Sequence, residues 1–373
     1  MSKVAQKDMI ISLFEQWSPR KLALDKDPGG LMIGTLDQPV QKVLTTLDVT
    51  EAVVDEAIEK GVDLIIAHHP LIFKPLTEID VKHGQGPIIE KCIKHDITVY
   101  AAHTNLDAAR GGVNDMLAEA LGLQSPNVLV PTYEEKLKKL VVFVPQENVE
   151  EVRQALGDAG AGHIGDYSHC TYGVDGTGTF IPGDETNPHI GTQGELEFVD
   201  EKRMETVVPV SKLPEVLQVL TGVHPYEEPA YDIYPVELPG EVYGLGRIGQ
   251  LASSMTLEAF AEKVKEDLNV PAVRVVGPAH ATVERVAVLG GDGNKFWPQA
   301  QKQGADVYVT GDIYFHTAQD AQMEGLNMVD PGHHVEAVMK EGVQQRLQNQ
   351  VNEMGFAVEV LASQRSTEPF RFQ

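Results

Sequence analysis

The sequence is poor in cysteine and in long apolar runs. Only Cys92 and Cys170 occur among 373 residues, in separate regions, so neither a disulfide framework nor a zinc ribbon is indicated. No apolar run approaches the roughly 18 residues of a membrane span, and residues 1–8 lack the apolar core of a signal peptide. These absences predict a cytoplasmic protein with no membrane partner.

Clustered positive charge is also missing. The chain carries 55 acidic residues against 30 Lys and Arg, a formal net charge of −25, and contains no Lys/Arg run. Because nucleic-acid binding requires a basic surface to meet the phosphates, this balance argues against a nucleic-acid partner. An acidic surface also attracts divalent cations.

The length predicts more than one domain, and the order of the apolar segments shows where they divide. Up to residue 130, strand-like runs at 43–50, 64–67 and 97–102 alternate with helical patterns. The same rhythm returns after residue 240, with strands expected at 283–289, 306–310 and 326–329. We therefore expect an α/β protein whose core consists of two similar α/β halves, residues 1–130 and 240–373, around a shared cleft.

Residues 131–239 follow another plan. The order strand, helix, strands, helix, strand is that of a small α+β unit of ferredoxin-like type. This block holds 20 Asp and Glu against 7 Lys and Arg, a net charge of 7 − 20 = −13, about half of the excess negative charge of the chain. Because its pattern of strands and helices differs from that of the two flanking α/β segments, we expect this block to be an inserted domain.

Histidines and acids follow the strand-like runs of both halves. His68 and His69 come directly after residues 64–67, Asp107 lies just beyond 97–102, and His333 and Glu336 follow 326–329. In open α/β sheets, binding sites form at the carboxyl ends of the strands. Three imidazoles and two carboxylates suit divalent transition metals and are enough for two ions.

Other polar residues near these strand ends leave more than one interpretation open. His103 is a metal ligand, a residue that orients Asp107 or a proton shuttle, of which we favour the last two. Asp312 and His316, at i and i+4 on an expected helix start, are either a general-base pair or an N-cap and a solvated side chain. The stretch 290–294, Gly-Gly-Asp-Gly-Asn, is an anion-binding turn or simply a tight turn, and it matches neither the P-loop nor the dinucleotide fingerprint.

Four motifs give the chain a specific resemblance. Ala67–Phe73 (AHHPLIF), His103–Asp107 (HTNLD), Thr310–Asp312 (TGD) and Gly332–His334 (GHH) with Glu336 occur in the order typical of the NIF-three-like family, the GTP cyclohydrolase 1 type 2 homologues. The chain departs from many members at residues 25–30, which read Asp-Lys-Asp-Pro-Gly-Gly where Trp-Asp-Asn is common.

The resemblance implies several properties. It implies a dinuclear metal site on His68, His69, Asp107, His333 and Glu336, with zinc favoured and iron or manganese as alternatives. It also implies a toroidal homohexamer and an insertion similar to the CutA and PII modules. The activity implied is hydrolysis of GTP to dihydroneopterin triphosphate and formate.

Metal-activated water suits a hydrolase of small phosphorylated compounds equally well. In either case the substrate is a small molecule, and His103, Asp312 and His316 are the candidate catalytic residues. A non-catalytic metal-binding regulator or scaffold, with a ligand-sensing PII-like insertion, is the alternative from another class of protein.

Overall fold

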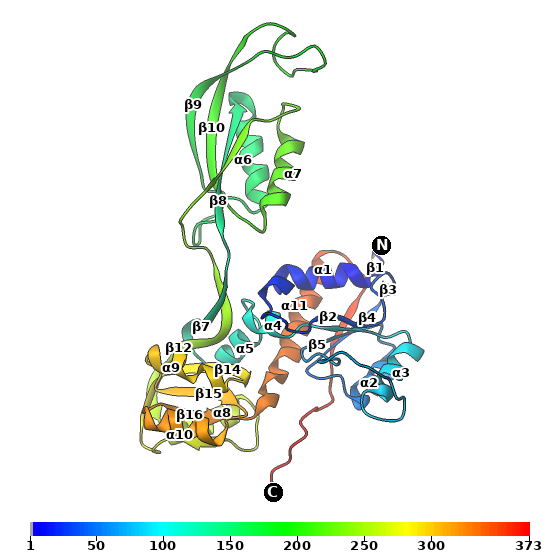
Figure 1. Cartoon of the computed structure of the whole chain (residues 1–373), viewed down its shortest axis with the longest axis vertical. Helices are drawn as coiled ribbons and strands as arrows, with labels where there is room; N and C mark the ends of the chain where they lie inside the picture. The colour runs from blue at the N-terminus through cyan, green and yellow to red at the C-terminus, as the bar shows by residue number, and fades with distance from the viewer. Residues whose placement is uncertain (1–2) are drawn as a thin grey trace. The chain divides into compact units, whose positions relative to one another are not determined.

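The computed structural model describes residues 3–373, which form two compact units (Figure 1). The first unit comprises the chain up to Tyr133 together with Tyr243–Gln373, and the second is Glu134–Val242. Among the described residues, no helix combines the length and the apolarity that crossing a membrane requires.

The first unit contains two main sheets, of which one has five strands. Their order is β17 (Glu359–Ala362), β4 (Lys42–Thr46), β5 (Leu64–Ala67), β6 (Thr98–Ala101) and β2 (Gly30–Ile33). Neighbours from β17 to β6 are parallel, and β2 is antiparallel to β6. Strands β5 and β6 are buried at every position because helices cover both faces, which explains their unbroken apolar sequences.

Two pairs of helices provide that cover. Helices α2 (Glu51–Lys60) and α3 (Gly86–Lys94) contribute to one apolar cluster with Leu44, Ile65 and Val99 of the sheet. Helices α1 (Lys7–Trp17) and α11 (Met339–Glu353) contribute to another with Leu64 and Ile66, neighbours of Ile65 that point to the opposite face.

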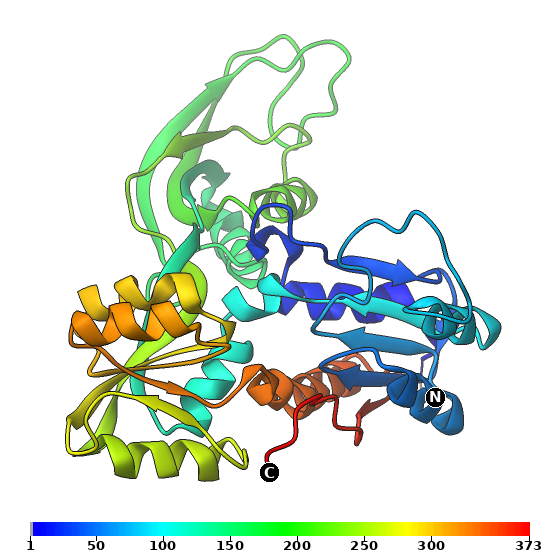
Figure 2. The same ribbon diagram turned by 60° about the horizontal axis from the view of Figure 1, so that its bottom comes forward.

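The other sheet of the first unit has six strands. Their order is β13 (Arg274–Val276), β16 (Asn327–Asp330), β15 (Val307–Gly311), β14 (Thr282–Asp292), β12 (Val242–Thr256) and β7 (Gln124–Glu134). Strands β14, β15 and β16 are parallel to one another. Helix α8 (Leu257–Asp267) packs on one face, and α9 (Trp297–Lys302) and α10 (Phe315–Met323) pack on the other (Figure 2).

In each sheet, one edge strand lies far in sequence from the other strands of that sheet. Strand β7 precedes the second unit in sequence but joins the six-stranded sheet, and β17, near the C-terminus, joins the five-stranded sheet. The remaining elements of the first unit are β1 (Ala5–Gln6), β3 (Pro39–Val40), α4 (Thr104–Ala108), α5 (Val113–Ala120) and the 3-10 helices η1 (Arg20–Leu22), η3 (Asn294–Phe296) and η4 (His333–Val338).

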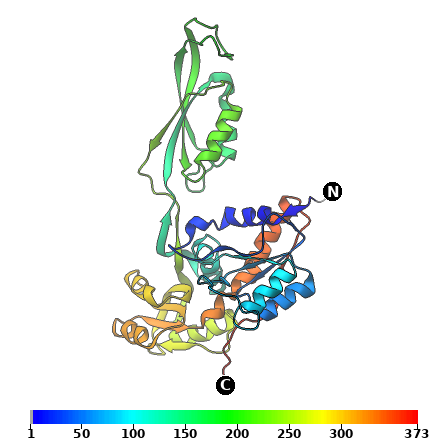
Figure 3. The ribbon, with the colours of Figure 1, turned by 45° about the vertical axis from the view of Figure 1, so that its right-hand side comes forward.

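The second unit is a four-stranded antiparallel sheet with two helices on one face (Figure 3). Along the chain it runs β8 (Leu137–Pro145), η2 (Gln146–Asn148), α6 (Val149–Asp158), β9 (Thr171–Phe180), β10 (Glu197–Pro209), α7 (Leu213–Val223) and β11 (Tyr231–Pro235). In space the strand order is β11, β8, β10, β9. Its own apolar core joins the sheet to α6 and α7.

A buried ion pair fixes β12 to α5 in the first unit. Arg247 is fully buried, and its Nε and Nη2 atoms lie 2.5 and 2.7 Å from the two carboxylate oxygens of Asp115. The guanidinium also donates to the carbonyls of Gly244 and Gly246. A bidentate pair with this many partners offsets the cost of burying the charge.

We expect Asp115→Asn to lower the free energy of unfolding by about 3 to 5 kcal/mol, because the buried guanidinium loses its counter-ion. Urea unfolding followed by circular dichroism measures this loss. The matched control is Glu90→Gln, which breaks the exposed 2.8 Å pair with Lys94 and should change stability by about 1 kcal/mol or less. Equal effects of the two variants would contradict the assignment.

Candidate metal centre

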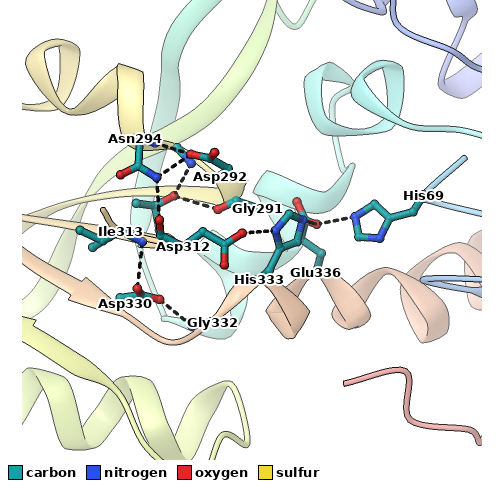
Figure 4. Close-up of polar contacts among 12 residues, drawn as sticks. His69, Gly291, Asp292, Asn294, Asp312, Ile313, Asp330, Gly332, His333 and Glu336 are labelled. Atoms are coloured by element: carbon teal, nitrogen blue, oxygen red, sulfur yellow. Dashed lines mark hydrogen bonds and ion pairs between the residues drawn. The ribbon is translucent and has the colours of Figure 1, made fainter. Parts of the chain in front are cut away.

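Three segments bring histidine and carboxylate groups together in the first unit. His68 and His69 directly follow β5, Asp107 lies on α4 after β6, and His333 and Glu336 lie on η4 after β16. In a 3-10 helix, side chains at i and i+3 eclipse each other, so His333 and Glu336 project to the same side. Figure 4 shows Glu336 beside the imidazoles of His69 and His333.

Glu336 is the centre of the cluster. Its Oε2 atom lies 3.0 Å from Nε2 of His69 and 3.2 Å from Nε2 of His333. Its Oε1 atom lies 3.8 Å from Nε2 of His68, which in turn is 3.6 Å from Oδ1 of Asp107. The cluster contains two sets of potential ligands, and Glu336 belongs to both. One set is His69, His333 and Glu336, and the other is His68, Asp107 and Glu336. Within each set the potential ligand atoms lie within 4.8 Å of one another.

Two potential ligand atoms of this cluster are buried and have no hydrogen-bond partner among residues 3–373. They are Nε2 of His68 and Oδ1 of Asp107. Buried polar atoms are nearly always paired, because an unpaired one loses its hydration without compensation. A divalent cation bound by imidazole and carboxylate would satisfy both atoms, so the residues present fit a metal site.

A polar partner orients each imidazole through its Nδ1 atom. The Nδ1 atoms of four histidines lie 2.6 to 2.9 Å from an oxygen. The pairs are His68 with the carbonyl of Ala102, His69 with Asp48, His103 with Asp27, and His333 with Asp312. Donation from Nδ1–H leaves Nε2 with the lone pair that a metal requires, as in the carboxylate–histidine pairs of metalloproteins.

Two glycines make room for the central carboxylate. A Cβ atom on Gly290 would stand 2.8 Å from Oε1 of Glu336, and one on Gly291 would stand 2.9 Å from it. Gly291 also has φ +63°, a left-handed conformation that favours glycine. The glycine-rich turn at the end of β14 thus lies against Glu336, a role that its sequence did not suggest.

The charges in the cluster are strongly coupled. Burial disfavours a charged His69, but hydrogen bonds with Asp48 and Glu336 outweigh it and raise the pKa to about 10. The hydrogen bond with Glu336 raises the pKa of His333 to about 9. Burial raises the pKa of Asp107 to about 6. Burial also opposes ionisation of Glu336, but hydrogen bonds from the surrounding histidines hold its pKa well below the usual range.

The structure brings together the five residues predicted as ligands, and it adds His103. A potential ligand atom of His103 lies within 4.8 Å of those of His68 and His69. Asp312 does not lie on a helix start as expected: α10 begins at Phe315, and Asp312 adopts φ +55° in the preceding turn. Its carboxylate instead accepts from Nδ1 of His333.

His316 is exposed on α10, with Nδ1 3.2 Å from Oε1 of Gln319, and its catalytic role stays a prediction. Sequence patterns did not point to two further residues, Asp48 and Asp27, whose carboxylates contact imidazoles of the cluster. Asp48 lies two residues beyond β4, another strand end, and this position was its only signal. Asp27 lies in the turn where the chain departs from the family motif, and it also accepts from the backbone N–H of Thr104.

We expect metal binding to release protons. At pH 7 the metal-free imidazoles of His69 and His333 hold a proton that a bound ion must displace, because their pKa values are raised to about 10 and 9. Affinity should therefore rise with pH up to these values. Calorimetric titration with Zn²⁺ in buffers of different ionisation enthalpy measures the release, and His163→Ala, an exposed histidine of the second unit, should leave it unchanged. Heat that does not depend on the buffer would contradict this expectation.

Asp48→Asn should weaken Zn²⁺ binding by about 10- to 100-fold, because the amide no longer fixes and polarises His69. Chelator competition measures the affinity. Asp320→Asn, an exposed acid on α10, is the matched control with the same loss of charge. If both variants bind as tightly as the wild type, the orienting role of Asp48 is wrong.

Comparison with known proteins gives concordant results. The family model Duf34/NIF3 (NGG1p interacting factor 3) matches residues 5–369. Proteins named "GTP cyclohydrolase 1 type 2 homolog" from Halalkalibacterium halodurans and Bacillus subtilis are each 56% identical, over 99% and 100% of this chain and 100% of their own length. The crystal structure of a Bacillus cereus protein related to NIF3 superposes with a TM-score of 0.95 at 57% identity, over 100% of both chains. The chain therefore belongs to the Duf34/NIF3 family.

Proposed function

We propose that this protein is a hydrolase with two divalent metal ions in each chain, with zinc favoured over iron or manganese. The observation that carries the proposal is the position of Glu336, whose two carboxylate oxygens face two different donor sets. His68 and Asp107 would hold one ion, and His69 and His333 would hold the other, with Glu336 belonging to both sets. Imidazole and carboxylate groups of this kind suit divalent transition metals.

The burial of the ligands indicates the open side of the centre. His68 and Glu336 are buried, whereas the side chains of His69, His103 and His333 keep 22, 20 and 40% of their surface exposed. Substrate therefore approaches on the side of these three imidazoles. Bound divalent ions would polarise the substrate and lower the pKa of bound water to about 7.

The position of His103 on this open side supports a role in proton transfer. Asp27 fixes its Nδ1 atom, and its ring centroid lies 5.3 Å from that of His68 and 5.8 Å from that of His69. Asp312 acts through His333, which it orients. We assign proton transfer to His103, with His316 as the second candidate.

The names of the relatives favour GTP as substrate, with water opening the guanine ring to give formate and dihydroneopterin triphosphate. Phe73 supports a flat substrate: its side chain is 56% exposed, and its ring centroid lies 6.3 Å from that of His103. An exposed aromatic ring beside the centre offers a stacking surface for a base. Small phosphorylated compounds are the other substrate class that such a centre would hydrolyse.

The proposal extends to the organisation of the protein. The two sheets of the first unit are two similar α/β halves, and the second unit is a ferredoxin-like domain of CutA/PII kind inserted between them. The order β8, α6, β9, β10, α7, β11 and the sheet order β11, β8, β10, β9 support this assignment. We also propose that the chain works in the cytoplasm as a homohexamer.

A metal-binding regulator without turnover is the alternative. The observation in its favour is that the second unit has a core of its own and a cavity suited to a ligand, described below. Ligand-dependent change in that unit, with stable metal binding and no turnover, would favour the regulator.

Metal content with formate release tests the proposal. We expect about two ions per chain by elemental analysis, and loss of metal in His68→Ala and Glu336→Ala because each removes a ligand. Formate should appear from GTP with the wild type but not with these two variants. His280→Ala, an exposed histidine outside the cluster, is the control and should keep both metal and activity.

The outcomes separate the parts of the proposal. If metal is bound but no formate forms, GTP is not the substrate. Phosphate esters then become the candidate substrates, or the protein is a regulator. Metal content unaffected by either substitution would overturn the dinuclear centre. If His103 transfers the proton, His103→Ala should lower kcat by about 10²- to 10⁴-fold while metal content is kept, and the same comparison on His316→Ala tests the second candidate.

A further inference from the structure

The second unit has a cavity on the sheet face that α6 and α7 leave uncovered. Side chains alternate across a strand, so Leu140, Val142 and Met204 point to the helices, whereas Phe143, Glu201 and Arg203 point to the other face. The cavity lies on that other face and has a volume of about 580 Å³, within the range of small-molecule sites. It is lined in addition by residues 180–183, 186, 188–190 and 226–228.

A buried carboxylate faces this cavity. Glu201 is 8% exposed, and its Oε1 atom accepts from the hydroxyl of Tyr226 at 3.1 Å. A Cβ atom on Gly178 of the neighbouring strand would stand 2.2 Å from Oε2, so the lack of a side chain there leaves room for the carboxylate in this position. Within residues 3–373, Glu201 forms no ion pair. Burying a carboxylate without a counter-ion is costly, and a cationic ligand would remove that cost.

The other lining groups also favour a cation. Glu227 and Glu228 are exposed at the edge of the cavity. Arg203 is the one Lys or Arg among the described lining residues, and its guanidinium pairs with Glu205, which also lies 3.4 Å from Nζ of Lys139. The positive charge in the lining is therefore already engaged, whereas the charge of Glu201 is not.

Aromatic rings form a further part of the wall. The ring centroid of Tyr226 lies 5.7 Å from that of Phe180 and 6.4 Å from that of His189, and Phe143 also lines the cavity. Aromatic faces attract cations and also bury the apolar body of a ligand. A carboxylate that can accept hydrogen bonds from N–H groups, surrounded by aromatic rings, suits a guanidinium or primary ammonium group.

We propose that the second unit binds a small organic cation in this cavity, with its guanidinium or ammonium group on Glu201 and its flat or apolar body among Phe143, Phe180 and Tyr226. The site is separate from the metal centre in residues and in chemistry. It would make the second unit a receptor for a metabolite of that class.

Calorimetric titration of the whole protein with phenethylguanidinium, against phenethylurea, tests this proposal. The two probes share shape, and only the first is charged; a guanidinium has no lone pair to offer a metal ion, so the metal centre does not compete. We expect saturable binding of the cation, at least tenfold weaker binding of the urea, and at least tenfold weaker binding of the cation by Glu201→Gln.

Two further variants complete the test. Tyr226→Phe keeps the ring and should retain binding more than Glu201→Gln does, whereas Glu185→Gln removes an acid of the same loop that does not line the cavity and should bind as the wild type. Equal binding of the two probes, equal loss in Glu185→Gln and Glu201→Gln, or no binding of the cation would overturn the proposal. The proposal would also be overturned if the cation did not bind and Glu201→Gln changed the size of the oligomer. That result would mean that the cavity receives a side chain from a second copy of the chain.

Discussion

The candidate metal centre depends on one buried carboxylate. Glu336 is only 3% exposed, and its ionised form is held by imidazoles on several sides. A buried charge of this kind is stable only with paired and well-oriented partners. The glycines at 290 and 291, the eclipsed position of His333 and the placement of His68 and His69 all serve this one group.

The outer partners turn a group of side chains into a defined site. Four imidazoles receive a hydrogen-bond partner on Nδ1, and three of these partners are carboxylates from separate loops. These outer partners fix which nitrogen of each imidazole is available. The candidate ligands themselves connect the two sheets of the first unit, since Glu336, which follows the six-stranded sheet, contacts His69, which follows the five-stranded one.

The second unit follows a different physical plan. Its core contains only its own residues, and its sheet is covered by helices on one face alone. The uncovered face carries Glu201, a buried acid that forms no ion pair with any residue the structure describes, together with aromatic rings. The candidate metal centre of the first unit and the proposed cation site of the second therefore consist of separate sets of residues.

The sequence by itself determined the local elements and the ligand types. Apolar runs such as 64–67 and 97–102 had to be buried strands, and the histidines and acids that follow them had to lie at the strand ends. The family motifs predicted five candidate ligands, and the structure brings these five residues together.

Only the tertiary structure decided what depends on long-range contacts. Asp27 and Asp48 act on histidines 76 and 21 residues away in sequence, and no local pattern encodes such a pairing. The same applies to the edge strands β7 and β17, whose partners lie far away along the chain. Asp312 was expected on a helix because its spacing to His316 suits one, but the chain turns at a positive φ there, which brings its carboxylate to His333. Spacing along the chain describes a regular element, whereas the outer partners of the site are set by how separate elements meet.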